Sequence, residues 1–221
     1  MTIREQEDLL FNEYRKKHPE IDKFVIDGII SEEQYNNARY KIIYILKEVN
    51  GGENWDLREF VKTGGRAATW NNIARWTAGI LELPKEINWD NLDKISENKR
   101  KDLLVKMGVV NLKKIPGGAV ANKDEINAKI DCELIKKQIE IYRPDIIICG
   151  GTFDMLRSSC YKKKESESYF TSRGIEYFLL NNKIPVIDYI HPQARIKNNI
   201  LYYTLIDATR EILEHHNLLC R

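Results

Sequence analysis

Four short runs of apolar residues, rich in β-branched side chains, predict the strands of a sheet. They cover residues 41–46, 109–112, 145–149 and 184–190. Each run is nearly continuous instead of alternating with polar residues, which is typical of strands that are buried on both faces. Strands of this kind occur in parallel sheets that are covered by helices.

Apolar residues recur with a helical period in three longer stretches, residues 66–81, 124–142 and 198–219. Asp124 is a candidate cap for the second helix, and Pro144 ends it before the next strand. The alternation of strands and helices predicts a doubly wound order with right-handed crossovers.

The expected fold class is therefore α/β, a three-layer αβα arrangement around a four-stranded, mainly parallel central sheet. Residues 1–35 are expected to form a helical N-terminal extension packed against it. With 221 residues, 43% of them hydrophobic, the chain is long enough for one sizeable core, and we expect a single domain over residues 1–221.

The charge of the chain excludes some classes of protein. Its 35 Lys and Arg against 33 Asp and Glu leave a net charge of +2, too balanced for a disordered chain or a histone-like coat. No apolar stretch approaches the ~20 residues of a membrane span, and the first residues lack a signal-peptide pattern. We therefore expect a soluble, cytoplasmic monomer without a membrane partner.

The basic residues gather in one part of the chain. Residues 94–114 hold seven basic and two acidic residues, a net charge of +5. Such a stretch suits a phosphate-facing surface, and equally a solvated helix face.

The four cysteines, at positions 132, 149, 160 and 220, include no Cys-x-x-Cys pair. Close pairs are typical of metal sites and disulfide scaffolds, and a core of this size needs no disulfide to fold. We expect all four to be ordinary packed residues, with Cys149 a small hydrophobe in its strand. The chain is expected to hold no metal and no cofactor.

Candidate chemistry follows each predicted strand. In an open parallel sheet, ligands bind outside the carboxyl ends of the strands. Those positions hold Glu48, Asn111, the turn Gly150-Gly151, and His191. An acid, an amide and an imidazole are thus predicted to share one rim. Structural roles remain open for each: a loop acid, an amide that ties down a loop, a strand-end cap and a tight turn.

Three short motifs resemble the uracil-DNA glycosylase superfamily. Residues 47–51 read Lys-Glu-Val-Asn-Gly, residues 65–67 read Gly-Arg-Ala, and residues 191–195 read His-Pro-Gln-Ala-Arg. The first is similar to the Gly-Gln-Asp-Pro-Tyr-His or Gly-Glu-Ala-Pro-Gly motif of that superfamily, and the last to its His-Pro-Ser-type turn. The resemblance covers about residues 40–215.

The resemblance implies a role for each strand-end residue. Glu48 resembles the acid that positions the attacking water, Asn111 the amide that reads the base, and His191 the group that stabilises the departing base. It also implies a base-binding set and a DNA-binding set. The base-binding set is Asn50, Gly51, Trp55 and Phe60, one of the two aromatic residues stacking on the base. The DNA-binding set is Lys113, Lys114, Gly150, Gly151, Arg195 and Ile196.

The chain departs from the family pattern at three positions. Lys47 replaces the first glycine and Asn50 the proline, whereas Gly51 stands where one branch has a tyrosine that fills the pocket. The cysteines lack the spacing of the iron–sulfur branches, so no cluster is expected.

The resemblance implies a monofunctional DNA glycosylase that flips out a base, a bulky modified cytosine or uracil, and hydrolyses its N-glycosidic bond. Some members of the superfamily act on modified cytosines of phage DNA, so antiviral defence is an implied use beside DNA repair. Two other interpretations stay open. One is a nucleic-acid-binding module on the same fold without activity. The other is a small-molecule enzyme that uses Gly150-Gly151 as a phosphate turn.

Overall fold

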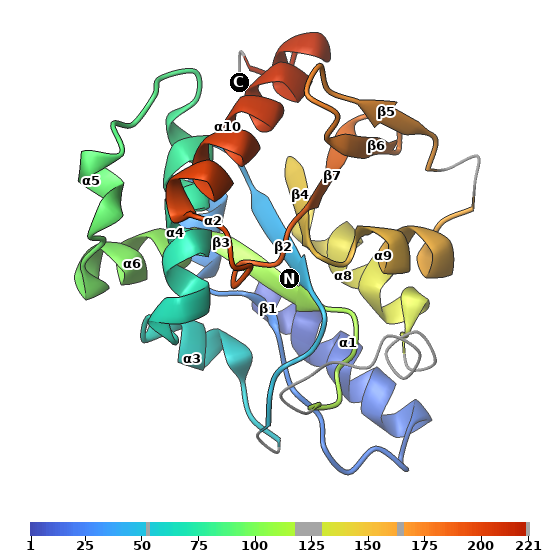
Figure 1. The fold of residues 1–221 in the computed structure, drawn as a ribbon. Helices are drawn as coiled ribbons and strands as arrows, with labels where there is room; N and C mark the ends of the chain where they lie inside the picture. Colours follow the sequence, from blue (N-terminus) through green and yellow to red (C-terminus); the bar gives the residue numbers. More distant parts are fainter. Residues whose placement is uncertain (52–53, 118–129, 163–165, 220–221) are drawn as a thin grey trace.

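The computed structural model describes residues 1–51, 54–117, 130–162 and 166–219 (Figure 1). Within them, one seven-stranded sheet has the order β1-β3-β2-β4-β7-β6-β5. The strands are β1 (Gly28–Ile29), β2 (Ile42–Leu46), β3 (Met107–Asn111), β4 (Ile146–Gly150), β5 (Ser168–Phe170), β6 (Glu176–Leu180) and β7 (Ile184–Tyr189).

The α/β class is confirmed, but the predicted count of four strands is wrong. Strand β2 pairs in parallel with β3 and β4, and β4 pairs in parallel with β7. The added strands are antiparallel: β1 beside β3, and the pair β5 and β6 beside β7. Strand β1 has only two residues. Strand β5 has three residues, which are largely exposed. Neither strand therefore produces an apolar run in the sequence.

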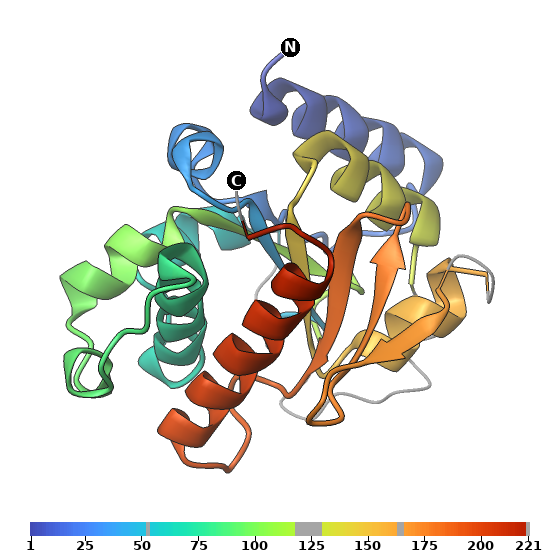
Figure 2. The same cartoon turned by 90° about the horizontal axis from the view of Figure 1, so that it is seen from above.

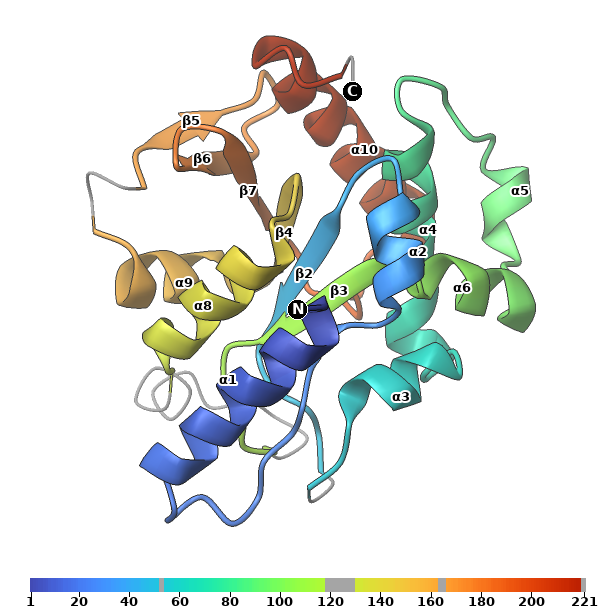
Figure 3. The ribbon, with the colours of Figure 1, turned by 180° about the vertical axis from the view of Figure 1, so that it is seen from behind.

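Helices cover both faces of this mixed sheet (Figures 2 and 3). One face packs against α3 (Leu57–Lys62), α4 (Ala67–Glu82), α5 (Asp90–Asp93), α6 (Glu97–Leu104) and α10 (Asn198–His215). The other face carries α1 (Ile3–Lys17), α2 (Glu32–Asn37), α8 (Cys132–Tyr142) and α9 (Phe153–Cys160). No helix of the described residues combines the length and the hydrophobicity that a membrane span needs.

The predicted helices differ from the observed ones mainly at their ends. Asp131 caps α8 by accepting a hydrogen bond from the backbone N–H of Leu134, so α8 begins later than predicted. The predicted cap, Asp124, lies outside the described residues. The N-terminal extension contains α1 and α2 as expected, and it also contributes β1 to the sheet.

Buried charges join this extension to the sheet. The Asp27 carboxylate, which is 0% exposed, accepts hydrogen bonds from Lys114 Nζ at 2.7 Å and from the Asn111 backbone N–H at 2.7 Å. Glu7 on α1 is also fully buried, and it accepts hydrogen bonds from Arg58 and from the Ile29 backbone N–H. Burial raises the pKa of Glu7 above its ordinary value. The extension is therefore part of the core.

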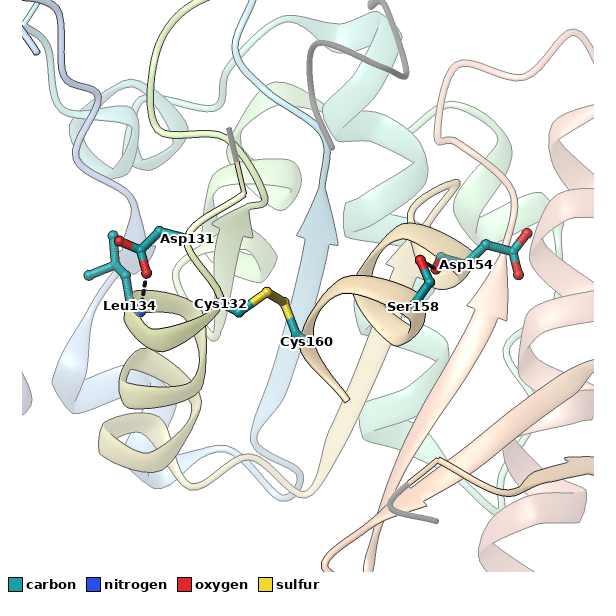
Figure 4. The surroundings of a disulfide bond; sticks show 6 residues. All are labelled: Asp131, Cys132, Leu134, Asp154, Ser158 and Cys160. Carbon is teal, nitrogen blue, oxygen red and sulfur yellow. Dashed lines mark hydrogen bonds between the residues drawn. A yellow bond between two sulfur atoms is a disulfide. The ribbon is translucent and has the colours of Figure 1, made fainter. Parts of the chain in front are cut away.

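A disulfide between Cys132 and Cys160 corrects the expectation that all four cysteines are unpaired (Figure 4). It joins the first residue of α8 to the last residue of α9, whose Cα atoms lie 5.0 Å apart. The two are 28 residues apart in sequence, and only the packing of the two helices brings them together. Cys149 is buried with a free thiol, as predicted, and burial raises its pKa. Cys220 lies outside the described residues.

The Asp27–Lys114 pair makes a testable contribution to stability. Replacing Lys114 with methionine leaves the Asp27 carboxylate buried without its cation, and we expect a loss of about 3–5 kcal/mol in the free energy of unfolding. Urea denaturation at pH 7 measures it. Lys62→Met is the control, because Lys62 is exposed and its pair with Glu59 spans 4.0 Å, so its loss should stay within about 0.5 kcal/mol. Equal losses in the two variants would contradict the assignment.

Candidate functional site

The carboxyl ends of β2 and β3, together with the turn after β7, border a cleft of about 420 Å³. Glu48, Asn111 and His191 all line it, although they are far apart in the sequence. The three residues predicted at the strand ends therefore lie around the same cleft. A larger cavity of about 690 Å³ lies at the opposite ends of the strands, bordered by Pro144 and Ile184. None of the three predicted residues lines it.

Backbone pairing beyond the strand ends positions Glu48. The N–H groups of Lys113 and Gly117 donate to the carbonyl oxygens of Lys47 and Val49 at 3.0 and 2.9 Å. The segment after β3 thus runs beside the segment after β2. Glu48 is held there by an ion pair in which its Oε2 lies 2.6 Å from Lys113 Nζ.

The expectation that Lys113 and Lys114 face a DNA backbone is wrong. Both side chains are almost completely buried, at 2% and 3% exposed, and each is paired with a carboxylate. Neighbouring residues of an extended segment point to opposite sides, so Lys113 reaches Glu48 at the cleft while Lys114 reaches Asp27 in the interior. Neither ammonium group is accessible to phosphates.

Asn111, the last residue of β3, is 2% exposed. Its backbone N–H donates to Asp27, but its side-chain amide has no hydrogen-bond partner within the described part of the chain. The amide can therefore bind a polar ligand in the cleft. Another lining residue, Trp55, has a buried Nε1 donor without a hydrogen-bond partner among the described residues. Such a donor costs about 1–3 kcal/mol, which a polar ligand would offset.

His191 presents a neutral imidazole to the cleft. Its Nδ1 accepts a hydrogen bond from the backbone N–H of Gln193 at 3.1 Å, which leaves the proton of a neutral ring on Nε2. Burial lowers the pKa of His191 below 6.5, and the positive charge of Lys47 lowers it further. The ring is therefore a neutral hydrogen-bond donor at pH 7.

Helix α4 fixes the turn that carries His191. Asn72 donates from Nδ2 to the carbonyl oxygen of Pro192 at 2.8 Å, and Arg75 donates to Asn72 Oδ1 at 2.8 Å. Gln193 Nε2 donates to the hydroxyl of Thr69. Because Thr69, Asn72 and Arg75 are all on α4, the imidazole has a defined position.

Aromatic side chains form another wall of the cleft. Trp55 and Phe60 meet edge to face, with ring centroids 5.4 Å apart, and both line the cleft. Trp70 on α4 also lines it, and its indole fills the place that a side chain at Gly65 would take. Trp70 was not predicted as a site residue, because its place in the helical period of residues 66–81 indicates a core position.

Three further lining residues, Arg66, Thr69 and Gln193, were not predicted as site residues. Arg66 and Gln193 lie inside the Gly-Arg-Ala and His-Pro-Gln-Ala-Arg segments, which was the available signal. No motif or pattern in the sequence indicated that Thr69 belongs to the site.

The glycines differ in their placement. Asn50 and Gly51 line the cleft, and a Cβ at Gly51 would meet no atom of the described residues within 4 Å. Gly150 and Gly151 are outside the lining: Gly150 packs against Leu46 and Pro192, and Gly151 has a φ of +71° beside His191. The pair forms the tight turn that ends β4.

Two cations, Lys47 and Arg66, line the cleft, and two exposed cations, Arg195 and Lys197, follow the His191 turn in the chain. None of them makes an ion pair with another described residue. Arg195 is exposed, as is Ile196 with 41% of its surface accessible.

Some basic residues of the stretch 94–114 make contacts within the fold. Arg100 is buried and donates to the Gly64 carbonyl oxygen and to Asn71, and Lys101 pairs with Glu97. Across the described ranges, no cluster of three or more His, Cys, Asp or Glu side chains could hold a metal ion.

No protein-family model matches this chain, and no curated protein matches it in sequence. The chemistry of the cleft is therefore the basis for a functional assignment.

The tautomer and charge of His191 can be measured by NMR. We expect its pKa to lie below 6.5, with the neutral ring protonated on Nε2. Lys47→Met should raise that pKa but leave it below 6.5, because burial is the larger of the two causes. Lys183→Met is the control, since Lys183 borders the cavity at the other end of the sheet. A His191 pKa at or above 6.5 would contradict this description of the site.

Proposed function

We propose that this protein is a monofunctional DNA glycosylase that hydrolyses the N-glycosidic bond of a flipped-out base and leaves an abasic site. The observation that carries the proposal is the meeting of Glu48, Asn111 and His191 around one cleft with an aromatic wall. The cleft volume falls in the range of about 300–1,000 Å³ that is usual for small-molecule sites, enough for a nucleobase.

The carboxylate of Glu48 suits the sugar side of the reaction. As the bond between C1′ and the base nitrogen breaks, its electron pair leaves with the base and positive charge grows on the sugar. A carboxylate stabilises that charge and orients a water molecule, whose oxygen then bonds to C1′. The proton released by the water passes to the carboxylate or to solvent.

His191 and Asn111 suit the base side. The departing base carries negative charge on its ring nitrogen and its carbonyl oxygens, and the Nε2–H of a neutral imidazole can donate a hydrogen bond to one of those oxygens. The unpartnered amide of Asn111 can both donate to and accept from a base edge. Each preorganised donor of this kind contributes about 3 kcal/mol to the transition state.

The aromatic wall and the cationic rim suit a flipped nucleotide. Extruding a base costs a few kcal/mol, of which stacking on Phe60 or Trp55 returns about 1–3 kcal/mol. The four cations at the rim would contact phosphates on the flanking strand, and Ile196 would enter the space that the base has left.

The open space at Gly51 favours a bulky modified cytosine over uracil as the substrate. Excision of modified cytosines would serve defence against phage with modified DNA, and excision of uracil would serve repair. We propose a cytoplasmic monomer that acts on single- or double-stranded DNA without a cofactor. A nucleic-acid-binding module without activity is the alternative, favoured by Lys47 and Asn50 in place of the motif's glycine and proline.

The proposal is tested with DNA carrying uracil, hydroxymethylcytosine or glucosylated cytosine, followed by alkaline cleavage of abasic sites. We expect strand breaks with at least one substrate, and a loss of about 10²–10⁴-fold in rate for Glu48→Gln, with DNA affinity retained. Glu59→Gln is the control, because Glu59 is exposed on α3 and outside the cleft. Binding of DNA without strand breaks from any substrate would favour the module instead.

The rim cations predict the salt dependence of DNA binding. Each phosphate contact contributes about −0.9 to the slope of log K against log salt concentration on duplex DNA, so Arg66→Gln with Arg195→Gln should reduce the slope by about 1–2. Arg143→Gln with Lys183→Gln, at the opposite end of the sheet, is the matched pair and should leave it unchanged. If the second pair weakens binding as much as the first, the DNA interface lies elsewhere.

A further inference from the structure

The buried ammonium group of Lys113 has no part in the proposed chemistry, although it lies 2.6 Å from the carboxylate that acts there. Its backbone N–H is hydrogen-bonded to Lys47, the residue before Glu48. Backbone pairing therefore places the lysine and the acid beside each other independently of their side chains. The backbone therefore brings the two members of the ion pair together beside the cleft.

The surroundings of Glu48 restrict its carboxylate on two sides. Oε2 is held by Lys113, and Gly117 lies so close to the carboxylate that any side chain at 117 would overlap it. Oε1 accepts no hydrogen bond from a described residue. One oxygen is therefore held by an ion pair, and the other lies against Gly117 without a hydrogen-bond donor among the described residues.

The burial of Glu48 explains why its pairing matters. The Glu48 side chain is 6% exposed, and a carboxylate buried to this extent is costly unless it is paired and hydrogen-bonded. The ammonium group of Lys113, 2.6 Å away, supplies both the ion pair and the hydrogen bond.

The neighbouring Lys114 shows the difference between a structural and a site cation. Its partner, Asp27, accepts further hydrogen bonds from Asn111 and Gln138 and lines no part of the cleft. Glu48 lines the cleft, and Lys113 is its one hydrogen-bond partner among the described residues.

We propose that Lys113 is a positioning residue for the glycosylase reaction: by pairing with Oε2 it holds the Glu48 carboxylate in the place from which it orients the attacking water. This inference rests on the proposed function. Because Lys113 acts through Glu48 and does not line the cleft, it is expected to affect the chemical step and not the binding of DNA.

The test is a set of variants assayed on the substrate that the wild-type protein cleaves. Lys113→Met should lower kcat about 10²-fold with KM unchanged, as expected for a misplaced catalytic group. Lys113→Arg, which keeps the cation, should recover most of that loss. Adding Lys113→Met to Glu48→Gln should lower kcat by less than about twofold, because the group through which Lys113 acts is already absent.

Arg58→Met is the matched control: it removes a buried cation that is paired with Glu7 and Asp56 and does not line the cleft, and at a temperature where it remains folded its kcat should equal that of the wild type. If Lys113→Met does not fold by circular dichroism, Lys113→Arg, Glu48→Gln and the double variant carry the same comparison, since the double variant removes both members of the Lys113–Glu48 pair. Wild-type kcat in Lys113→Met, or a full additional loss in the double variant, would overturn the role of Lys113 while leaving the proposed function intact. An inactive wild-type protein would instead contradict the proposed function itself.

Discussion

Two consecutive lysines, each buried against a different carboxylate, are the constraint on which the site depends. The segment that follows β3 continues alongside the segment that follows β2, and its extended backbone sends Lys113 to Glu48 and Lys114 to Asp27. A buried ammonium group without a counter-charge costs several kcal/mol, so both pairs must form for this segment to be buried at all. The need to pair these buried lysines therefore also determines the position of Glu48 in the cleft.

The second half of the site depends on α4 in a similar way. Arg75 donates to two backbone carbonyl oxygens, those of Leu92 and Asp93, and to the Asn72 side chain. Asn72 then donates to the turn that holds His191. The imidazole is therefore anchored through hydrogen bonds that also join α4 to the chain after it. A mobile histidine would be a poor donor to a developing charge, because its alignment would have to be restored in each turnover.

The distribution of charge fits a site that holds a neutral ring beside a charged backbone. Inside the cleft, the one described carboxylate is neutralised by a lysine and the one imidazole is neutral. At the rim, cations remain without ion pairs among the described residues. A nucleobase would meet amide and imidazole groups, whereas the phosphates beside it would meet positive charge.

Much of this arrangement could be predicted from the sequence, for a physical reason. Strands buried on both faces require continuous apolar runs, so β2, β3, β4 and β7 were recognisable, and the carboxyl ends of parallel strands meet at one edge. Glu48, Asn111 and His191 could therefore be placed together before any coordinates were known. Strands β1 and β5 escaped because short or exposed strands leave no such run. Strand β6 does have an apolar run, residues 177–180, which the prediction missed.

Only the tertiary structure decided what the charged residues and the cysteines do. Lys113 and Lys114 look like surface residues in a basic stretch, and their burial follows from Glu48 and Asp27, which are 65 and 87 positions away. The disulfide partners and the wall formed by Trp70 likewise depend on contacts between distant segments. Local pattern determines which residues leave each strand, whereas the balance between desolvation and pairing, which sets whether a charge is buried, exists only once the chain has folded.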